Sequence, residues 1–130
     1  MEKKIFRVLV VDDEMDIRNV LTSFLPKKLN VEVFTTGDGQ KAVEMARDLK
    51  LDLILLDIHL PGHMGWDVLR EIREFDQDVK IVISTGIFVV PKENEEFLLQ
   101  HTSGYMIKPV NLEAIYLKIV EALGDQVVRK

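Results

Sequence analysis

The chain has 130 residues, 47% hydrophobic and 30% charged, a balance that suits one globular domain with a single core. Its net charge of −5 argues against direct nucleic-acid binding, which needs a basic surface, and the lack of cysteine excludes disulfides, thiolate metal ligands and a cysteine nucleophile. No signal peptide or apolar stretch near the roughly 20 residues of a membrane span is present, so we expect a cytoplasmic chain without membrane contact.

Strand and helix patterns alternate along the first third of the chain. Residues 5–11 form an apolar strand. Apolar residues then recur at helical spacing over residues 15–25, which predicts an amphipathic helix. Pro26 should end this helix or kink its last turn. A second short strand covers residues 31–35, and Asp38 is placed to cap a second helix after it.

The middle of the chain continues the alternation. Residues 51–56 form a strand whose last four residues are all apolar. A glycine- and proline-containing loop, 61–65, leads into a third helix with Trp66 on its apolar side. A fourth strand covers residues 80–83. The segment 87–103 is the least regular, with four apolar residues before a proline and a weakly amphipathic stretch that suggests a short helix.

The last part of the chain completes the pattern. Residues 105–107 form a short fifth strand, and Asn111 caps a final helix that Gly124 stops. Five strands alternating with five helices predict an α/β protein, a three-layer α/β/α sandwich with a parallel sheet and right-handed crossovers. We expect one domain over residues 1–130, with residues 125–130 as a tail or the start of a further segment.

Polar side chains follow four of the predicted strands. Asp12 and Asp13 come after the first, Asp57 after the third, Thr85 after the fourth and Lys108 after the fifth. Ligands of open α/β sheets bind beyond the carboxyl ends of the strands. Carboxylates hold Mg²⁺, a lysine and a hydroxyl bind phosphoryl oxygens, and one carboxylate remains as a nucleophile able to form an aspartyl-phosphate. This inventory predicts phosphoryl-transfer chemistry.

Four motifs in order, VVDDE, LLDIHLPGHMG, ISTG and YMIKP, resemble the receiver domain of two-component response regulators over nearly the whole chain. The resemblance implies a flavodoxin-like, five-stranded sheet in the order 2-1-3-4-5, which is characteristic of this family. It also implies that Asp57 accepts a phosphoryl group from the phosphohistidine of a sensor histidine kinase. Asp13, Asp57 and the backbone carbonyl of His59 would ligate Mg²⁺, and Asp12 would hold the ion chiefly through water.

The resemblance assigns the remaining site residues as well. Thr85 and Lys108 would bind the phosphoryl oxygens, and Tyr105 occupies the position of an aromatic switch whose rotamer follows Thr85. A kinase would dock on the first helix, where Val20 lies at the edge of the apolar stripe, and on the loop that carries Pro109 and Val110. The chain would then be a phosphoacceptor signalling module rather than an enzyme, and it would act on a downstream protein or on an output domain absent from this sequence.

Simpler interpretations stand beside these. Asp12 and Asp13 could cap the following helix, Lys108 could be a surface charge, and Val20 and Tyr105 could belong to the core. Residues 87–90 could fold inward, or they could be exposed and meet a partner or a second copy of the chain, so that a dimer is possible.

A Mg²⁺-dependent phosphohydrolase with Asp57 as its nucleophile is the alternative function. An acid two residues after Asp57 would favour it as a general acid, and His59 stands there instead.

Overall fold

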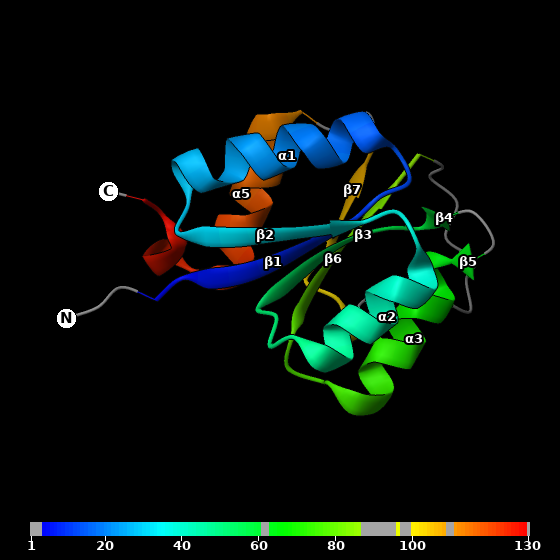
Figure 1. Cartoon of the computed structure of the whole chain (residues 1–130). Helices are drawn as coiled ribbons and strands as arrows, with labels where there is room; N and C mark the ends of the chain where they lie inside the picture. Colours follow the sequence, from blue (N-terminus) through cyan, green and yellow to red (C-terminus); the bar gives the residue numbers. More distant parts are fainter. Residues whose placement is uncertain (1–3, 61–62, 87–95, 97–99, 109–110, 130) are drawn as a thin grey trace.

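A computed structural model of the chain describes residues 4–60, 63–86, 96, 100–108 and 111–129 (Figure 1). Its main sheet has five parallel strands in the order β2-β1-β3-β6-β7. These strands are β1 (Phe6–Val11), β2 (Val31–Thr36), β3 (Leu53–Asp57), β6 (Lys80–Thr85) and β7 (Tyr105–Ile107). Counted along the chain, the order is the expected 2-1-3-4-5, and the labels differ because two short strands intervene.

Helices cover both faces of the sheet, as the three-layer prediction requires (Figure 1). One face carries α1 (Met15–Lys28) and α5 (Leu112–Leu123), and the other carries α2 (Gly39–Asp48) and α3 (Gly65–Phe75). Among the described helices, none combines the length and apolar composition that crossing a bilayer requires.

The strands alternate between two separate cores. In β1, Leu9 and Val11 pack with α2 and α3, whereas Val8 and Val10 pack with α1 and α5. All five residues of β3 are buried. A strand buried on both faces must be apolar throughout, and this explains why the first and third strands read as continuous apolar runs. Those runs make the sheet rigid where it positions the polar residues that follow it.

The predicted helix caps are present. The Asp38 carboxylate accepts a hydrogen bond from the Gln40 N–H (2.9 Å), and the Asn111 side chain accepts one from the Ala114 N–H (2.7 Å). Gly124 follows α5 with a φ of 88°, in the left-handed region that glycine tolerates best.

Two local expectations differ from the structure. Pro26 lies inside α1, which continues to Lys28, because a proline in the last turn removes one hydrogen bond without ending the helix. The segment between β3 and α3, expected to be a loop, contains an antiparallel pair of two-residue strands, β4 (His59–Leu60) and β5 (His63–Met64). Such short strands leave no periodicity in a sequence.

The expected C-terminal tail is packed over its described part. Residues Asp125–Val127 form a 3₁₀ turn, Val127 is fully buried, and Val128 forms an antiparallel bridge with Leu29. The Asn30 N–H donates to the Val127 carbonyl (2.7 Å). Two adjacent valines in a short terminal segment give too little signal to separate such docking from a free tail.

The expectations for residues 87–90 and for a helix around residues 97–99 lie outside the described residues. Residues 96, 100 and 101, on either side of that stretch, have helical backbone.

Candidate functional site

The carboxyl ends of neighbouring strands bring the predicted polar residues to one edge of the sheet. Asp12 follows β1, Asp57 ends β3, and Lys108 follows β7. The Lys108 Nζ lies 2.9 Å from the Oδ2 of Asp12 and 2.9 Å from the Oδ2 of Asp57. One ammonium therefore joins residues that are 96 and 51 positions away from it in the sequence.

The first acidic loop is fixed by backbone hydrogen bonds. The Asp12 N–H continues the sheet by donating to the Thr36 carbonyl (3.1 Å), and the Asp12 Oδ1 accepts from the Glu14 N–H (2.9 Å). Asp12 is buried and Asp13 is exposed. The capping alternative holds only in part: Glu14, not Asp12 or Asp13, is the N-cap residue of α1, and the Asp12 carboxylate binds the N–H of that residue rather than one inside the helix.

Asp57 is held by partners on both carboxylate oxygens. Its Oδ1 accepts from the His59 N–H (3.0 Å), while its Oδ2 faces Lys108. The side chain is only 3% exposed. A carboxylate this deeply buried must have charged or N–H partners, and here it has both.

Lys108 is directed inward by its backbone as well as by its charge. Its N–H donates to the Thr85 carbonyl (2.7 Å), which continues the pairing of β7 with β6. The side chain is 22% exposed and also lies 3.9 Å from Glu14. The interpretation of Lys108 as a surface charge is therefore wrong.

The pKa values of Asp57 and Lys108 are both raised, with opposite consequences for their charges. Burial raises the pKa of Asp57, although the hydrogen bonds from Lys108 and His59 oppose that rise. Burial would lower the pKa of Lys108, but the hydrogen bonds and charges of Asp12 and Asp57 outweigh it, so the pKa is raised. Lys108 is thus firmly cationic, whereas the charge of Asp57 costs free energy without a further cation.

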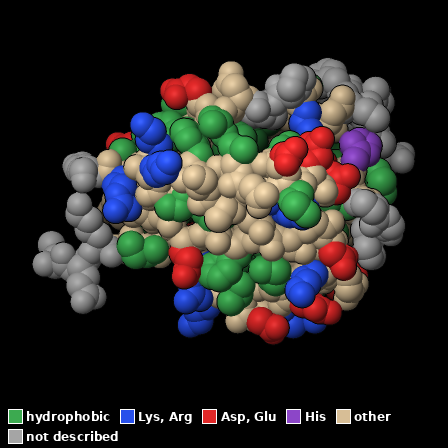
Figure 2. Space-filling model, turned by 45° about the horizontal axis from the view of Figure 1, so that its top comes forward, with side chains coloured by type: hydrophobic (Ala, Val, Ile, Leu, Met, Phe, Trp, Pro, Cys, Tyr) green, Lys and Arg blue, Asp and Glu red, His purple; other side chains and the backbone are tan. Residues whose placement is uncertain are grey.

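Three carboxylates could hold such a cation. One oxygen from each of Asp12, Asp13 and Asp57 lies within 4.8 Å of the others. An all-oxygen donor set with one exposed member fits Mg²⁺, which binds carboxylates through one or two direct ligands and keeps several waters. In Figure 2, acidic side chains gather at the right-hand end, toward which the strands of Figure 1 run.

The other predicted residues occupy the same edge or its border. Thr85 is buried at the end of β6, one residue after Ser84, which pairs with Asp57 in the sheet. His59 is exposed in β4, and its backbone follows directly on the acidic strand end. Tyr105 is 41% exposed, so the core interpretation of this residue is wrong. Pro109 and Val110 lie outside the described residues.

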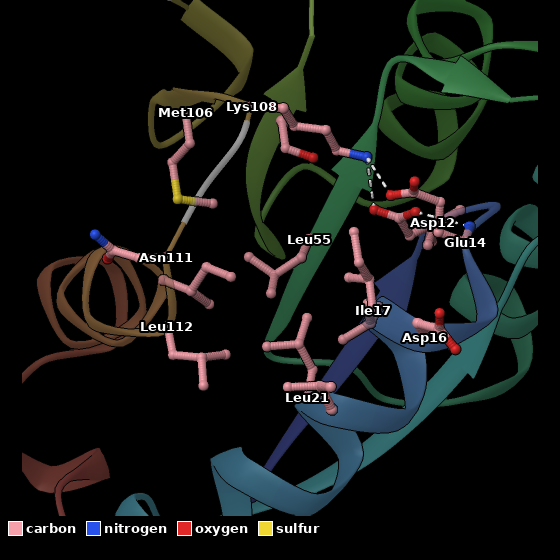
Figure 3. A pocket seen from close by; sticks show the side chains of 15 residues that line it. Asp12, Glu14, Asp16, Ile17, Leu21, Leu55, Met106, Lys108, Asn111 and Leu112 are labelled. Carbon is pink, nitrogen blue, oxygen red and sulfur yellow. Dashed lines mark hydrogen bonds and ion pairs between the residues drawn. The ribbon is translucent and has the colours of Figure 1, made fainter.

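A cavity of about 860 Å³ extends from the acidic cluster between α1 and α5 (Figure 3). Apolar side chains such as Ile17, Leu21 and Leu112 line it, and Lys108 crosses its upper end toward Asp12. Val20 also borders the cavity and is 47% exposed, so it does not belong to the core.

One residue near the site was missed by sequence reasoning. The Arg18 guanidinium donates from Nη1 to the backbone carbonyl of Asp12 (2.6 Å). An arginine on the polar side of an amphipathic helix is ordinary, and nothing in its spacing distinguishes it from a solvated charge.

Comparison with known proteins places this arrangement in context. Residues 8–120 match the family model described as the response regulator receiver domain. The transcriptional regulatory protein YrkP of Bacillus subtilis is 32% identical over 118 residues, which are 91% of this chain and 49% of that protein. The chain spans about half the length of the curated relatives it matches.

Solved structures agree with these matches. A CheY-like receiver domain protein from Methanospirillum hungatei JF-1 superposes with a TM-score of 0.83 at 27% identity, covering 95% of this chain and 97% of that one. TrrA of Thermotoga maritima, solved with Mg²⁺ and BeF, has a TM-score of 0.75 at 31% identity and covers 91% and 99%. TrrA has also been solved in complex with the histidine kinase ThkA.

Proposed function

Because this chain belongs to the response regulator receiver domain family, we propose that Asp57 accepts a phosphoryl group from the phosphohistidine of a histidine kinase, in a Mg²⁺-dependent reaction. The modified domain then acts on a downstream protein or on an output domain outside this sequence. The observation that carries the proposal is the double ion pair of Lys108 with Asp12 and Asp57, at the edge where the three carboxylates meet.

The residues present can perform this transfer. A carboxylate oxygen of Asp57 attacks phosphorus, and the bond from phosphorus to the histidine nitrogen breaks as the new oxygen–phosphorus bond forms. Lys108 is already 2.9 Å from the Asp57 Oδ2, and its ammonium forms an ion pair with one of the incoming phosphoryl oxygens. Thr85, at the end of the next strand, supplies a hydroxyl for another phosphoryl oxygen.

Asp12, Asp13 and Asp57, together with the His59 backbone carbonyl, are the residues that would hold Mg²⁺. Asp13 would ligate the ion directly, and Asp12 would act chiefly through water. When bound, the ion neutralises negative charge on the phosphoryl group and the acids. The rest of the positioning comes from the chain itself, because Asp12 and Asp57 are both buried on rigid strand ends.

The kinase partner follows from the same site. TrrA, a relative of known structure, forms a complex with a histidine kinase. In this chain we place the docking surface on α1, around the exposed Val20, and on the loop of Pro109 and Val110. A cytoplasmic location, usual for this family, is part of the proposal.

Phosphorylation would switch the domain by redirecting Lys108 and Thr85. Lys108 contacts Asp57, Thr85 ends the neighbouring strand β6, and Tyr105 begins β7, the edge strand that pairs with β6. A phosphoryl group on Asp57 would bind Lys108 and the Thr85 hydroxyl and favour a second arrangement of β6, β7 and Tyr105. The proposal also includes a downstream partner that recognises this change, and dimerisation of the receiver domain.

The proposal is tested with acetyl phosphate as a small phosphodonor. With Mg²⁺ present, the intact mass should rise by one phosphate, and Asp57→Asn should abolish the gain. An Asp52→Asn variant, which changes an acid at the opposite end of β3, is the matched control and should still be phosphorylated. An unchanged mass in the unmodified chain would contradict the proposal.

The comparisons support the receiver function and not the phosphohydrolase alternative.

A further inference from the structure

Arg18 of α1 holds the peptide group that joins the first two acidic residues. Its Nη1 donates to the Asp12 carbonyl oxygen at 2.6 Å. That carbonyl belongs to the peptide bond between Asp12, which is buried, and Asp13, which is exposed. The direction of this peptide plane therefore sets the angle between two of the three carboxylates that meet at the site.

The Asp12 side of this peptide is already fixed. The Asp12 N–H is bound to the Thr36 carbonyl and its Oδ1 accepts from the Glu14 N–H. Rotation about the bonds that follow Asp12 would leave the Thr36 contact in place, would pull the Glu14 N–H away from the Asp12 Oδ1, and would turn the Asp13 carboxylate away from the cluster. A charged hydrogen bond from Arg18 opposes this rotation, and charge-assisted bonds are about twice as strong as neutral ones.

Gly37, in the loop after β2, leaves the space that the guanidinium occupies. A Cβ at this position would lie 2.7 Å from the Arg18 Nη1 and 3.4 Å from the Asp12 carbonyl oxygen. The backbone of Gly37 does not require glycine, because the positive-φ glycines in the described residues are Gly104 and Gly124. Steric room for Arg18 is thus the feature that alanine at this position would remove.

We propose that Arg18 is a positioning residue for the Mg²⁺ site: it orients the Asp12–Asp13 peptide so that both carboxylates face the ion, and Gly37 admits its guanidinium. This inference rests on the proposed function, since it concerns the same site. Under this proposal, α1 and the loop after β2 take part in metal binding, although neither Arg18 nor Gly37 supplies a carboxylate ligand.

The direction of the change in Mg²⁺ affinity distinguishes a positioning role of Arg18 from a purely electrostatic one. A guanidinium near a cation site repels the ion, so removal of its charge alone would strengthen Mg²⁺ binding. Positioning predicts the opposite result, weaker binding, because residues that orient metal ligands commonly change affinity by tenfold or more. Gly37→Ala makes the same test with the charge retained, because the added methyl group displaces the guanidinium from the carbonyl.

The experiment measures Mg²⁺ affinity by titration calorimetry in Arg18→Gln, Gly37→Ala and the double variant. Thermal melts without Mg²⁺ establish that each variant is folded. We expect each single variant to bind Mg²⁺ about tenfold more weakly than the unmodified chain, and the double variant to lose no more than either. Arg7→Gln, which makes the same change at the opposite end of β1, is the control and should bind normally.

Unchanged or tighter Mg²⁺ binding in either single variant would overturn the role of Arg18, and so would additive losses in the double variant. Each of these outcomes leaves the proposed function standing. Failure of the unmodified chain to bind Mg²⁺ at millimolar concentration would instead overturn the proposed function, and the role of Arg18 with it.

Discussion

Among the individual side chains, Lys108 supplies the charge that allows the acidic cluster to fold. Asp12 and Asp57 are almost completely buried, and the Lys108 ammonium lies 2.9 Å from a carboxylate oxygen of each. Breaking such a pair by removing one member is costly, because the remaining charges stay buried without compensation. Mg²⁺ at the same carboxylates would take over part of this compensation.

Lys108→Met should therefore lower the free energy of unfolding by about 3 kcal/mol in the absence of Mg²⁺, and Mg²⁺ should restore part of the loss. Urea unfolding with and without the ion measures both effects. Lys4→Met is the matched control, because Lys4 pairs with Asp52 at a similar distance, 2.8 Å, but in an exposed position where ion pairs contribute little. Equal effects of the two variants would contradict this view of Lys108.

Asp57→Asn should have the opposite effect on the metal-free chain, because Lys108 keeps its ion pair with Asp12 and no buried charge is left without a partner. The pKa of Asp57 is raised by burial, so above that pKa the folded state bears a cost for the carboxylate that a neutral amide avoids. We expect a gain of about 1 kcal/mol at neutral pH, the low end of the repulsion between two nearby carboxylates. Thermal melts measure it, and Mg²⁺ should stabilise the variant less than the unmodified chain. A lower melting temperature without Mg²⁺ would contradict the prediction.

The sequence reveals these acids and not the residues that orient them. Asp57 interrupts a wholly apolar strand, and Lys108 follows a short one, so both are conspicuous at predicted strand ends. Arg18 and Gly37 meet only through the packing of α1 against the loop after β2, and neither residue type is unusual in its own segment. Their contact depends on tertiary packing, which the periodicity of a sequence does not reveal.

The helices α1 and α5 define the surface beside the site. They lie on the same face of the sheet and enclose a cavity of about 860 Å³ that reaches the acidic cluster (Figure 3). Val20 stands on its border with nearly half of its surface exposed. A partner that docks on α1 would thus contact Val20, which borders the same cavity as Asp12, and would not need to contact the acidic side chains.

Val20→Lys should slow phosphoryl transfer from a cognate histidine kinase by tenfold or more, because a charge would be placed in an apolar contact. Phosphorylation by acetyl phosphate, which needs no docking surface, should be unchanged. Leu117→Lys is the matched control, since Leu117 is an exposed apolar residue on α5 outside the residues that line the cavity. Equal slowing by both variants, or slowing of the acetyl phosphate reaction by Val20→Lys, would contradict docking on α1.

Helix and strand boundaries follow the sequence where a capping or apolar pattern is strong. Asp38, Asn111 and Gly124 mark helix ends correctly, because each makes a local contact that its residue type favours. Pro26 does not mark the end of α1, which continues to Lys28, since a proline in the last turn removes only one hydrogen bond. The β4–β5 pair is too short to produce a pattern at all.

Across the molecule, the sheet separates the functional edge from the chain termini. The acidic cluster lies beyond the carboxyl ends of the strands, whereas Val127 and Val128 dock beside the start of β2 at the other end (Figure 1). The docked segment closes the core between α1 and α5, where Val127 is fully buried. The two ends should therefore respond independently to substitution.

Val127→Ala should lower the free energy of unfolding by about 2 kcal/mol, because it removes buried methyl groups from this core. Mg²⁺ affinity should stay within twofold of that of the unmodified chain. Urea unfolding and calorimetric Mg²⁺ titration measure the two properties separately. A stability change near zero would show that the terminal segment is not docked in solution, and a large loss of Mg²⁺ affinity would contradict the independence of the two ends.

The central claim is that Asp57, among all the acids at this edge, carries the phosphoryl group. It is tested most directly by treating the chain with acetyl phosphate, reducing the product with borohydride, which converts an aspartyl-phosphate into homoserine, and locating that residue by peptide mass spectrometry. We predict homoserine at position 57 alone, and only when Mg²⁺ was present. Modification at Asp12 or Asp13, or modification that does not depend on Mg²⁺, would contradict the account.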